Sequence, residues 1–185
     1  MTVKEAIIQR RTIRKFTQMP IPPEVLLELV EAGRVAPSGG NLQPLKYKII
    51  TGALCEDVFS HVRWAAYLKD GAPKEGERPT AYILILADTE IRKSGYEFDM
   101  GAAAENIQLA AWEKGIGACW MGSIDRKEIL ALCGIDDTRY VMPTLLALGY
   151  SGQESYSEDC TDDSIKYYSD ENGVIHVPKR TDILL

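Results

Sequence analysis

The chain has 185 residues, with 21 Lys and Arg against 27 Asp and Glu, which gives a formal net charge of −6. This acidic balance argues against nonspecific binding to nucleic acid or to anionic membranes, and no stretch approaches the roughly 20 apolar residues of a membrane span. The length and the 45% hydrophobic fraction suit one domain over residues 1–185. Because the N-terminus has no apolar signal-peptide core, a cytoplasmic protein is predicted.

Basic side chains gather at both ends of the chain. Residues 1–16 carry a single carboxylate, Glu5, against five basic side chains, Lys4, Arg10, Arg11, Arg14 and Lys15. A second basic pair, Lys179 and Arg180, follows a run dominated by carboxylates. Because arginine holds a phosphate dianion through two parallel charge-assisted hydrogen bonds, the two clusters could converge on one phosphate. Solvated surface charge is the alternative.

The first half of the chain predicts two helices and a strand. A short helix over residues 3–9 leads into the arginines, and Pro22-Pro23 starts a second helix that Gly33 would stop. Residues 45–51 are expected to form a strand with Tyr47 and Ile49 on one face. Residues 54–62 have weaker helical character, and residues 69–79 form a polar loop rich in Gly and Pro.

The second half alternates between apolar strands and helices. Residues 81–87 are apolar throughout, as in a strand covered on both faces. A long helix over 99–114 ends at Gly115, and the spacing of Asp125 and Glu128 predicts a capped helix over 126–133, closed by Gly134. Residues 143–150 form another buried strand, residues 151–173 are acidic and turn-rich, and residues 170–173 make a turn before 174–177. This mixture, without a strict βαβ rhythm, favours the α+β class.

Two glycine-containing stretches could contact a ligand. The loop at residues 36–44, APSGGNLQP, offers the amides of Asn41 and Gln43, which can match the mixed donor and acceptor edge of a pyrimidine-like ring. Its glycines allow close backbone approach. An ordinary turn is the alternative, and the glycines of residues 115–123 need only be helix stops and bends. Neither G-x-G-x-x-G nor G-x-x-x-x-G-K-[ST] occurs, which disfavours nucleotide-binding folds of those types.

Cysteines and histidines form no reactive or metal-binding pattern. Four cysteines, Cys55, Cys119, Cys133 and Cys160, lack C-x-x-C spacing, and the histidines are His61 and His176. Neither a metal site nor a Cys–His nucleophile is therefore predicted. No side chain stands out as an obligatory acid or base, so no catalytic residue is predicted.

Taken in order, these motifs resemble the nitroreductase family of FMN-dependent oxidoreductases. Residues 10–16, RRTIRKF, resemble its R-R-S-x-R-x-F motif, and residues 36–44 resemble its A-P-S-x-x-N-x-Q-P loop. The family's D-x-G…N…A…G-x-G…W-x-G stretch is followed by Asp99, Gly101, Asn106, Ala110 and residues 115–122. Residues 146–150 resemble its late strand, and residues 178–180 its closing phosphate-binding element. The resemblance covers residues 3–182.

The resemblance implies an α+β fold, with a central and mostly antiparallel sheet flanked by helices, in an intertwined homodimer with FMN at its interface. The FMN phosphate and ribityl chain would be contacted by Arg10, Arg11, Thr12, Arg14, Lys179 and Arg180. The isoalloxazine would be approached, usually from the partner subunit, by Pro37, Ser38, Gly39, Asn41 and Gln43. Backbone groups around Gly122 and Ser123 would lie beside flavin N5 and O4, with Trp120 and Met121 packing against the ring.

The implied activity is a two-step cycle, in which NADH or NADPH gives a hydride to flavin N5 and a small-molecule acceptor, such as a nitroaromatic or a quinone, then takes the electrons. One alternative is a specialised dehalogenating or flavin-processing branch of the same fold. The other is a flavin storage or sensing protein without turnover. Two departures from the family pattern bear on the substrate: Leu45 replaces a frequent aromatic after the Q-P, and the stretch between Val62 and Thr80 is short.

Overall fold

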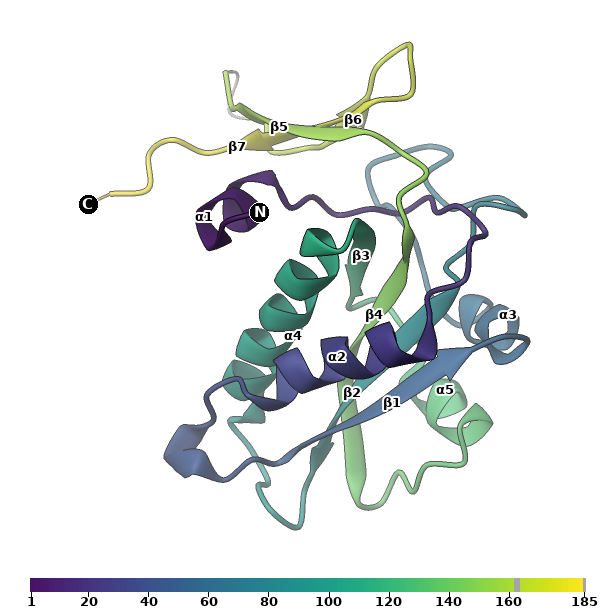
Figure 1. The fold of residues 1–185 in the computed structure, drawn as a ribbon, viewed down its shortest axis with the longest axis vertical. Helices are drawn as coiled ribbons and strands as arrows, with labels where there is room; N and C mark the ends of the chain where they lie inside the picture. The colour runs from purple at the N-terminus through teal and green to yellow at the C-terminus, as the bar shows by residue number, and fades with distance from the viewer. Residues whose placement is uncertain (162–163, 185) are drawn as a thin grey trace.

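The computed structural model describes residues 1–161 and 164–184 (Figure 1). Its helices are α1 (Val3–Gln9), α2 (Pro23–Arg34), α3 (Leu54–Phe59), α4 (Tyr96–Glu113) and α5 (Arg126–Leu132), with a short 3₁₀ turn η1 (Gly39–Asn41). Its strands are β1 (Leu45–Thr51), β2 (Ala81–Asp88), β3 (Ile116–Met121), β4 (Tyr140–Tyr150), β5 (Ser155–Asp159), β6 (Tyr168–Ser169) and β7 (Ile175–Lys179). Within these ranges, no helix combines the length and apolar character that crossing a bilayer requires.

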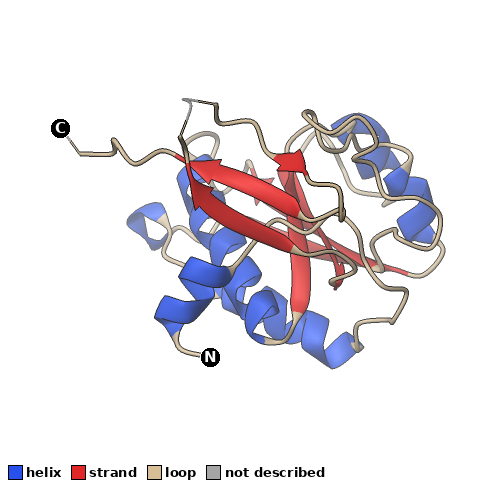
Figure 2. Ribbon diagram, turned by 90° about the horizontal axis from the view of Figure 1, so that it is seen from above, coloured by secondary structure: helices blue, strands red, loops and turns tan. Residues whose placement is uncertain are grey.

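Four strands form a central antiparallel sheet in the order β1-β2-β4-β3. Strands β2 and β4 are its interior strands, with Ile83 opposite Leu146, and β3 lies at one edge, with Ala118 opposite Leu148. Helices lie on both faces of this sheet (Figures 1 and 2). The predicted α+β class, with a mostly antiparallel sheet flanked by helices, is therefore confirmed.

The side chains of β2 alternate between two hydrophobic cores, one on each face of the central sheet. Because successive side chains of a strand point to opposite faces, Ile83 and Ile85 pack in one core and Tyr82 and Leu84 in the other. The first core includes buried residues of α2 and α4, and the second those of α3 and α5. All eight residues of β2 are buried, which confirms a strand covered on both faces. Each fully buried large aliphatic side chain contributes about 1.5–3 kcal/mol.

Local capping fixes where two helices begin. At α1, the Thr2 hydroxyl accepts the Glu5 N–H at 3.2 Å and the Glu5 carboxylate accepts the Thr2 N–H at 2.7 Å, a complete capping box. At α5, Asp125 accepts the Glu128 N–H at 3.3 Å, but the Asp125 N–H donates to the carbonyl of His61 at 2.8 Å. The predicted capping box of α5 is therefore only half formed, because the His61 carbonyl, rather than the Glu128 side chain, accepts the Asp125 N–H.

A second, three-stranded sheet, in the order β5-β7-β6, lies over α1 (Figure 1). Residues 151–173, predicted to be acidic and turn-rich, also contain the strands β5 and β6, which the sequence does not indicate. Strand β5, SYSED, carries little strand propensity of its own, and its parallel pairing with β7 supplies the missing stabilisation. The predicted turn at 170–173 is confirmed, with Gly173 at φ 81° and the Asp170 N–H donating to the Val174 carbonyl.

Residues 116–121 also form a strand, β3, although the glycines of residues 115–123 could be explained from the sequence as helix stops and bends. Gly115, at φ 73°, does stop α4, but β3 begins at the next residue. Gly117 lies inside β3, where an added Cβ would stand 2.6 Å from Cβ of Ile13. The glycine therefore serves the close approach of another chain segment, a reason that sequence spacing does not reveal.

Candidate functional site

Residues 12 and 13 pair with the outer edge of β3, and residues 15–17 then bond to the end of β4 and to the residues after it. Thr12 forms a parallel bridge with Ala118, and the Ile13 N–H donates to the Ala118 carbonyl at 3.0 Å. In this extended segment Ile13 is buried between the partly exposed Thr12 and Arg14. Phe16 is buried where the segment reaches Gly149 of β4. This arrangement places the basic segment beside β3, which ends at Met121 and leads into residues 122 and 123.

The three arginines of this segment differ in the partners that their guanidinium groups already have. Arg10 Nε lies 3.1 Å from Oε1 of Glu105, and Arg11 donates to the Ile8 carbonyl and to the Ser157 hydroxyl, both at 2.6 Å. Within the described residues, the Arg14 guanidinium makes no hydrogen bond or ion pair, and it lies 4.5 Å from the ring centroid of Tyr167. Arg14 is therefore the arginine whose donors are free for an anion.

The C-terminal basic pair reaches this region through the second sheet. Lys179 ends β7 and is paired with Asp159 of β5, and the same β5 carries Ser157, which contacts Arg11. Lys179 and Arg180 are both exposed, and neither side chain has a hydrogen bond or ion pair to the described residues. The structure brings the sheet that carries the pair to the arginine segment, without a direct contact between the two clusters.

Residues 67–71 line a cavity of about 440 Å³ next to Arg14. The opposite wall comes from the C-terminal part of the chain, including Gln153 and Tyr168. Lys69 adds a cation with no partner among the described residues, whereas Lys15 pairs with Glu77 at 3.4 Å. Sequence reasoning left the role of this segment open, because nothing local indicates that it folds back on residues 14 and 15.

The chain becomes exposed where it leaves β3. Trp120 is 39% exposed, whereas the Met121 side chain is buried in the core on the α3 and α5 side. Gly122 and Ser123 are exposed, and an added Cβ on Gly122 would meet nothing within 4 Å. Trp120 rather than Met121 therefore has side-chain surface available to a ligand, and backbone at 122 and 123 can be approached closely.

The loop at residues 36–44 has an unusual backbone. Asn41 and Gln43 adopt positive φ angles of 54° and 51°, in the left-handed region that non-glycine residues rarely occupy, and Gly40 lies at 61°. The Ser38 hydroxyl accepts the Gln43 N–H at 3.0 Å, and the Gln43 amide donates to Oδ1 of Asn41 at 3.2 Å. Strain of this kind concentrates at ligand-binding sites, and it is not visible in residue spacing.

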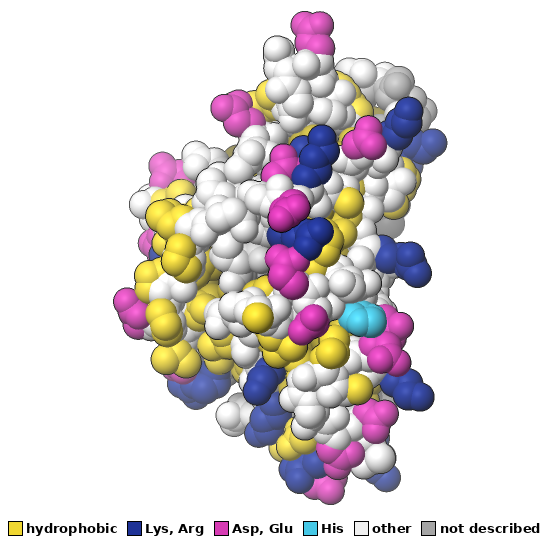
Figure 3. All heavy atoms as spheres, turned by 90° about the vertical axis from the view of Figure 1, so that its right-hand side faces the viewer, with side chains coloured by type: hydrophobic (Ala, Val, Ile, Leu, Met, Phe, Trp, Pro, Cys, Tyr) yellow, Lys and Arg dark blue, Asp and Glu magenta, His cyan; other side chains and the backbone are white. Residues whose placement is uncertain are grey.

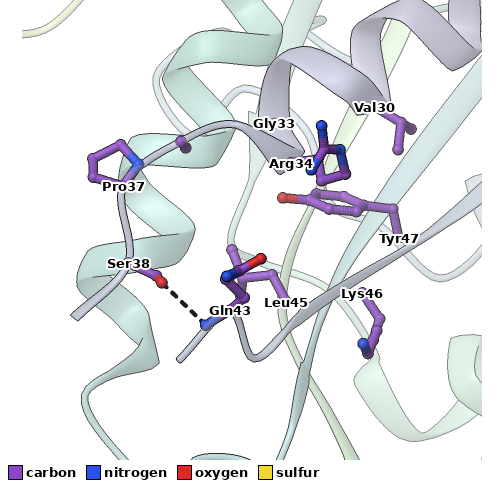
Figure 4. A pocket seen from close by; sticks show the side chains of 10 residues that line it. Val30, Gly33, Arg34, Pro37, Ser38, Gln43, Leu45, Lys46 and Tyr47 are labelled. Atoms are coloured by element: carbon purple, nitrogen blue, oxygen red, sulfur yellow. Dashed lines mark hydrogen bonds between the residues drawn. The ribbon is translucent and has the colours of Figure 1, made fainter. Parts of the chain in front are cut away.

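A cavity of about 370 Å³ lies between this loop, the end of α2 and β1 (Figure 4). Pro37, Ser38 and Gln43 line one side, and Arg34 and Tyr47 are among the residues that line the rest. Burial raises the pKa of Tyr47 to about 12, so its hydroxyl stays protonated and can act as a donor. The cavity thus combines amide and hydroxyl groups with aromatic surface.

The candidate site residues fall into two groups in the protomer. Residues 10–14, 120–123 and the C-terminal sheet form one, and residues 36–44 form the other. In Figure 1 the segment after α1 crosses the upper part of the molecule, whereas the loop that contains η1 lies at its lower left. Within the described ranges, no three or more His, Cys, Asp or Glu side chains gather where they could hold a metal. Figure 3 shows acidic and basic side chains interspersed on the face that carries α3 and α5.

Comparison with known proteins relates this geometry to one family. Residues 7–150 match the model described as "Nitroreductase family". A relative from Archaeoglobus fulgidus, named "Putative NADH dehydrogenase/NAD(P)H nitroreductase", is 30% identical over 155 residues, which cover 80% of this chain and 84% of the relative. An "NADH dehydrogenase" from Thermus thermophilus is 28% identical, covering 84% of this chain and 90% of that protein.

Solved structures give the same result. A "putative nitroreductase in complex with fmn" from Desulfovibrio desulfuricans has a TM-score of 0.73 at 28% identity, covering 88% of this chain and 93% of that one. The fold, the order of the motifs and the related sequences therefore all indicate the same family.

Proposed function

The chain belongs to the nitroreductase family, and on that premise we propose that it is an NADH- or NADPH-dependent FMN oxidoreductase. Its acceptor would be a nitroaromatic, a quinone or a related small molecule. The named relatives and the FMN-containing structural neighbour support this class of activity. FMN, when bound, would supply the hydride- and electron-transfer chemistry, and the chain's own residues would bind and orient it.

One observation carries the proposal: an unpaired arginine and exposed backbone lie along the same edge strand. Arg14 follows the residue that bonds to Ala118, and Gly122 and Ser123 follow the end of the same strand. Burial raises the pKa of the Cys119 thiol to about 11, and the nearby Arg14 guanidinium opposes this rise. A cationic end and an open backbone end on one edge fit a ligand with a phosphate at one end and a polar ring at the other.

The side chains would share the binding as follows. Arg14 would hold the phosphate through charge-assisted hydrogen bonds, while Arg10 and Arg11, which already have protein partners, would supply long-range attraction and position the segment. Lys179 and Arg180 have no competing partner in the described residues and would add positive charge from the second sheet. The exposed Trp120 would offer an apolar face to the ring.

A homodimer would complete the site. The loop at residues 36–44 lies far from residues 10–14 in one protomer (Figure 1), so a flavin held by both groups would need the loop of a second copy. Helix α4 offers a surface for this, because Phe98 is 84% exposed and Gly101, one turn later, has nothing within 4 Å of an added Cβ. An exposed aromatic beside small residues is a suitable helix-packing surface.

Flavin content and flavin reduction test the proposal. Purified protein should bind FMN and show the visible absorbance of oxidised flavin. This absorbance should bleach on mixing with NADH or NADPH and recover when a nitroaromatic or a quinone is added. Protein that remains colourless after FMN is added contradicts the proposal. Bound flavin that neither nucleotide reduces would favour storage or sensing, and product analysis with iodotyrosine would test the dehalogenating alternative. Sedimentation of the FMN-loaded protein should give a dimer.

A further inference from the structure

Two side chains hold consecutive carbonyl groups where the chain leaves β3. The Thr144 hydroxyl, on β4, donates to the Met121 carbonyl at 2.6 Å, and Thr144 is only 2% exposed. Arg126, the first residue of α5, donates from Nη2 to the Gly122 carbonyl at 3.1 Å. The carbonyl oxygens of residues 121 and 122 are therefore both fixed from the protein side.

The Arg126 guanidinium is committed to backbone carbonyls. It donates from Nε to Met142 at 3.1 Å and from Nη2 to Pro143 at 3.0 Å, in addition to its bond to Gly122. Among the described residues it forms no ion pair, so its positive charge is not neutralised by a carboxylate. Since β4 and α5 both contribute to this arrangement, it is anchored on regular elements rather than on a loop.

The direction of two N–H groups follows from the planarity of the peptide bond. In a trans peptide the N–H points opposite to the carbonyl, and no cis peptide occurs in the described chain. Fixing the carbonyls of Met121 and Gly122 therefore fixes the N–H groups of Gly122 and Ser123. Neither N–H has an acceptor among the described residues.

The Gly122 N–H points to the edge that carries the basic segment. Backbone groups of successive strand residues point alternately to the two sides. The Ala118 carbonyl points outward to Ile13, and the Met121 carbonyl points inward to Thr144 on β4. Gly122 continues the outward set of Ala118, so its free N–H faces the outer edge of β3.

We propose that Arg126 and Thr144 are positioning residues that hold the N–H groups of Gly122 and Ser123 as a fixed pair of donors for the negative charge of a reduced flavin. This inference rests on the proposed FMN function. Donors that are already oriented stabilise developing charge without reorganisation, and the missing side chain at Gly122 leaves them accessible. The unneutralised charge of Arg126 adds to the same effect.

The test compares variants that differ only in the ability to hold these carbonyls. Thr144→Val removes the hydroxyl at constant shape, and Thr144→Ser retains it; Arg126→Met removes the guanidinium. Arg63→Met is the matched control, because Arg63 is exposed, has no side-chain partner among the described residues, and changes the net charge equally. The midpoint potential of bound FMN against free FMN gives the ratio of the affinities for reduced and oxidised flavin.

Thr144→Val and Arg126→Met should each lower that ratio about tenfold, which is about 30 mV for two electrons. Thr144→Ser and Arg63→Met should change it less than threefold. Potentials of Thr144→Val and Arg126→Met that match the wild type would overturn the inference while leaving the proposed function intact.

A measurement without flavin separates the two proposals. In the flavin-free protein, the NMR order parameters of the Gly122 and Ser123 N–H groups should fall from about 0.85 to below about 0.6 in Thr144→Val and Arg126→Met. Unchanged order parameters would overturn the positioning role whether or not FMN binds. Failure of the wild type to bind FMN would instead overturn the proposed function.

Discussion

The carboxylate of Asp99 accepts the backbone N–H of Gly39 at 2.9 Å, although the two residues are 60 positions apart. Its second oxygen lies 3.0 Å from Nη1 of Arg92, and Asp99 is only 4% exposed. An added Cβ on Gly39 would stand 2.5 Å from the same Arg92 atom. The strained loop at residues 36–44 is thus held against α4 by a buried charge.

Replacing Asp99 with alanine should destabilise the protein, because it leaves Arg92 and the Gly39 N–H without their acceptor. The expected loss is about 1–3 kcal/mol, measured from urea unfolding midpoints. Glu97→Ala is the control, since Glu97 lies exposed in the same first turn of α4 and should cost less than about 0.5 kcal/mol. Equal losses would show that charge at the start of the helix, rather than the loop contact, is responsible.

Arg14→Ala should weaken FMN binding by about 1.5–3 kcal/mol, because one charge-assisted set of hydrogen bonds is lost. Arg180→Ala should have a similar effect if the two basic clusters hold one phosphate. Fluorescence titration of the flavin measures both. Lys114→Ala removes the same charge from a surface pair with Glu28 and should leave the affinity unchanged. Wild-type affinity in both arginine variants would mean that these residues are surface charges.

Gly117→Ala should destabilise the protein by about 1–3 kcal/mol, because the new methyl overlaps Ile13. Trimming Ile13 to glycine in the same chain removes the Cβ that the new methyl meets and should relieve part of this loss. A double-mutant cycle on unfolding free energies should therefore show a coupling of at least about 1 kcal/mol. Additive losses would indicate that the segment at residues 10–16 can move away from β3 without penalty.

The second sheet should become less stable as pH rises above neutrality. His176 lies between Glu158 at 3.0 Å and Asp170 at 3.4 Å and stacks on Tyr168, whose hydroxyl also donates to Glu158. The hydrogen bond to Glu158 is the main cause that raises the pKa of His176. Because the pKa of His176 is higher in the folded protein than in the unfolded chain, protonation of His176 stabilises the fold. This stabilisation is complete below the unfolded pKa of about 6.5 and is lost as pH rises through the higher folded pKa.

His176→Gln measures that contribution directly. The difference in melting temperature between wild type and His176→Gln should be largest near pH 6, where both carboxylates are ionised, and should shrink toward pH 8.5. A difference that is constant with pH would contradict a charged His176 in the folded protein.

Sequence reasoning predicts what depends on local pattern. The run at residues 81–87 marks β2, and Asp125 marks the start of α5, because apolar runs and caps act within a few residues. It misses β5, whose strand character comes from pairing with β7, and it misses the role of Gly117, which depends on Ile13 more than 100 positions away. The motif residues proposed for the site are readable in the sequence. Arg126 and Thr144 are not, because they bond to backbone carbonyls that only the folded chain brings near. Arg92 is not readable either, because its role depends on the contact of Asp99 with Gly39.

The crossing of residues 10–16 over β3 has a consequence for how the protein is made. The contacts of Ile13 with Ala118 and of the Thr17 N–H with the Tyr150 carbonyl close very long loops. Closing such loops is slow, since their entropy is lost before the contacts form. Because residues 10–16 are made before β3 and β4, we expect them to dock only after both strands have emerged. Until then the outer edge of β3 is unprotected, and newly made chains would depend on that late docking to avoid strand-to-strand association.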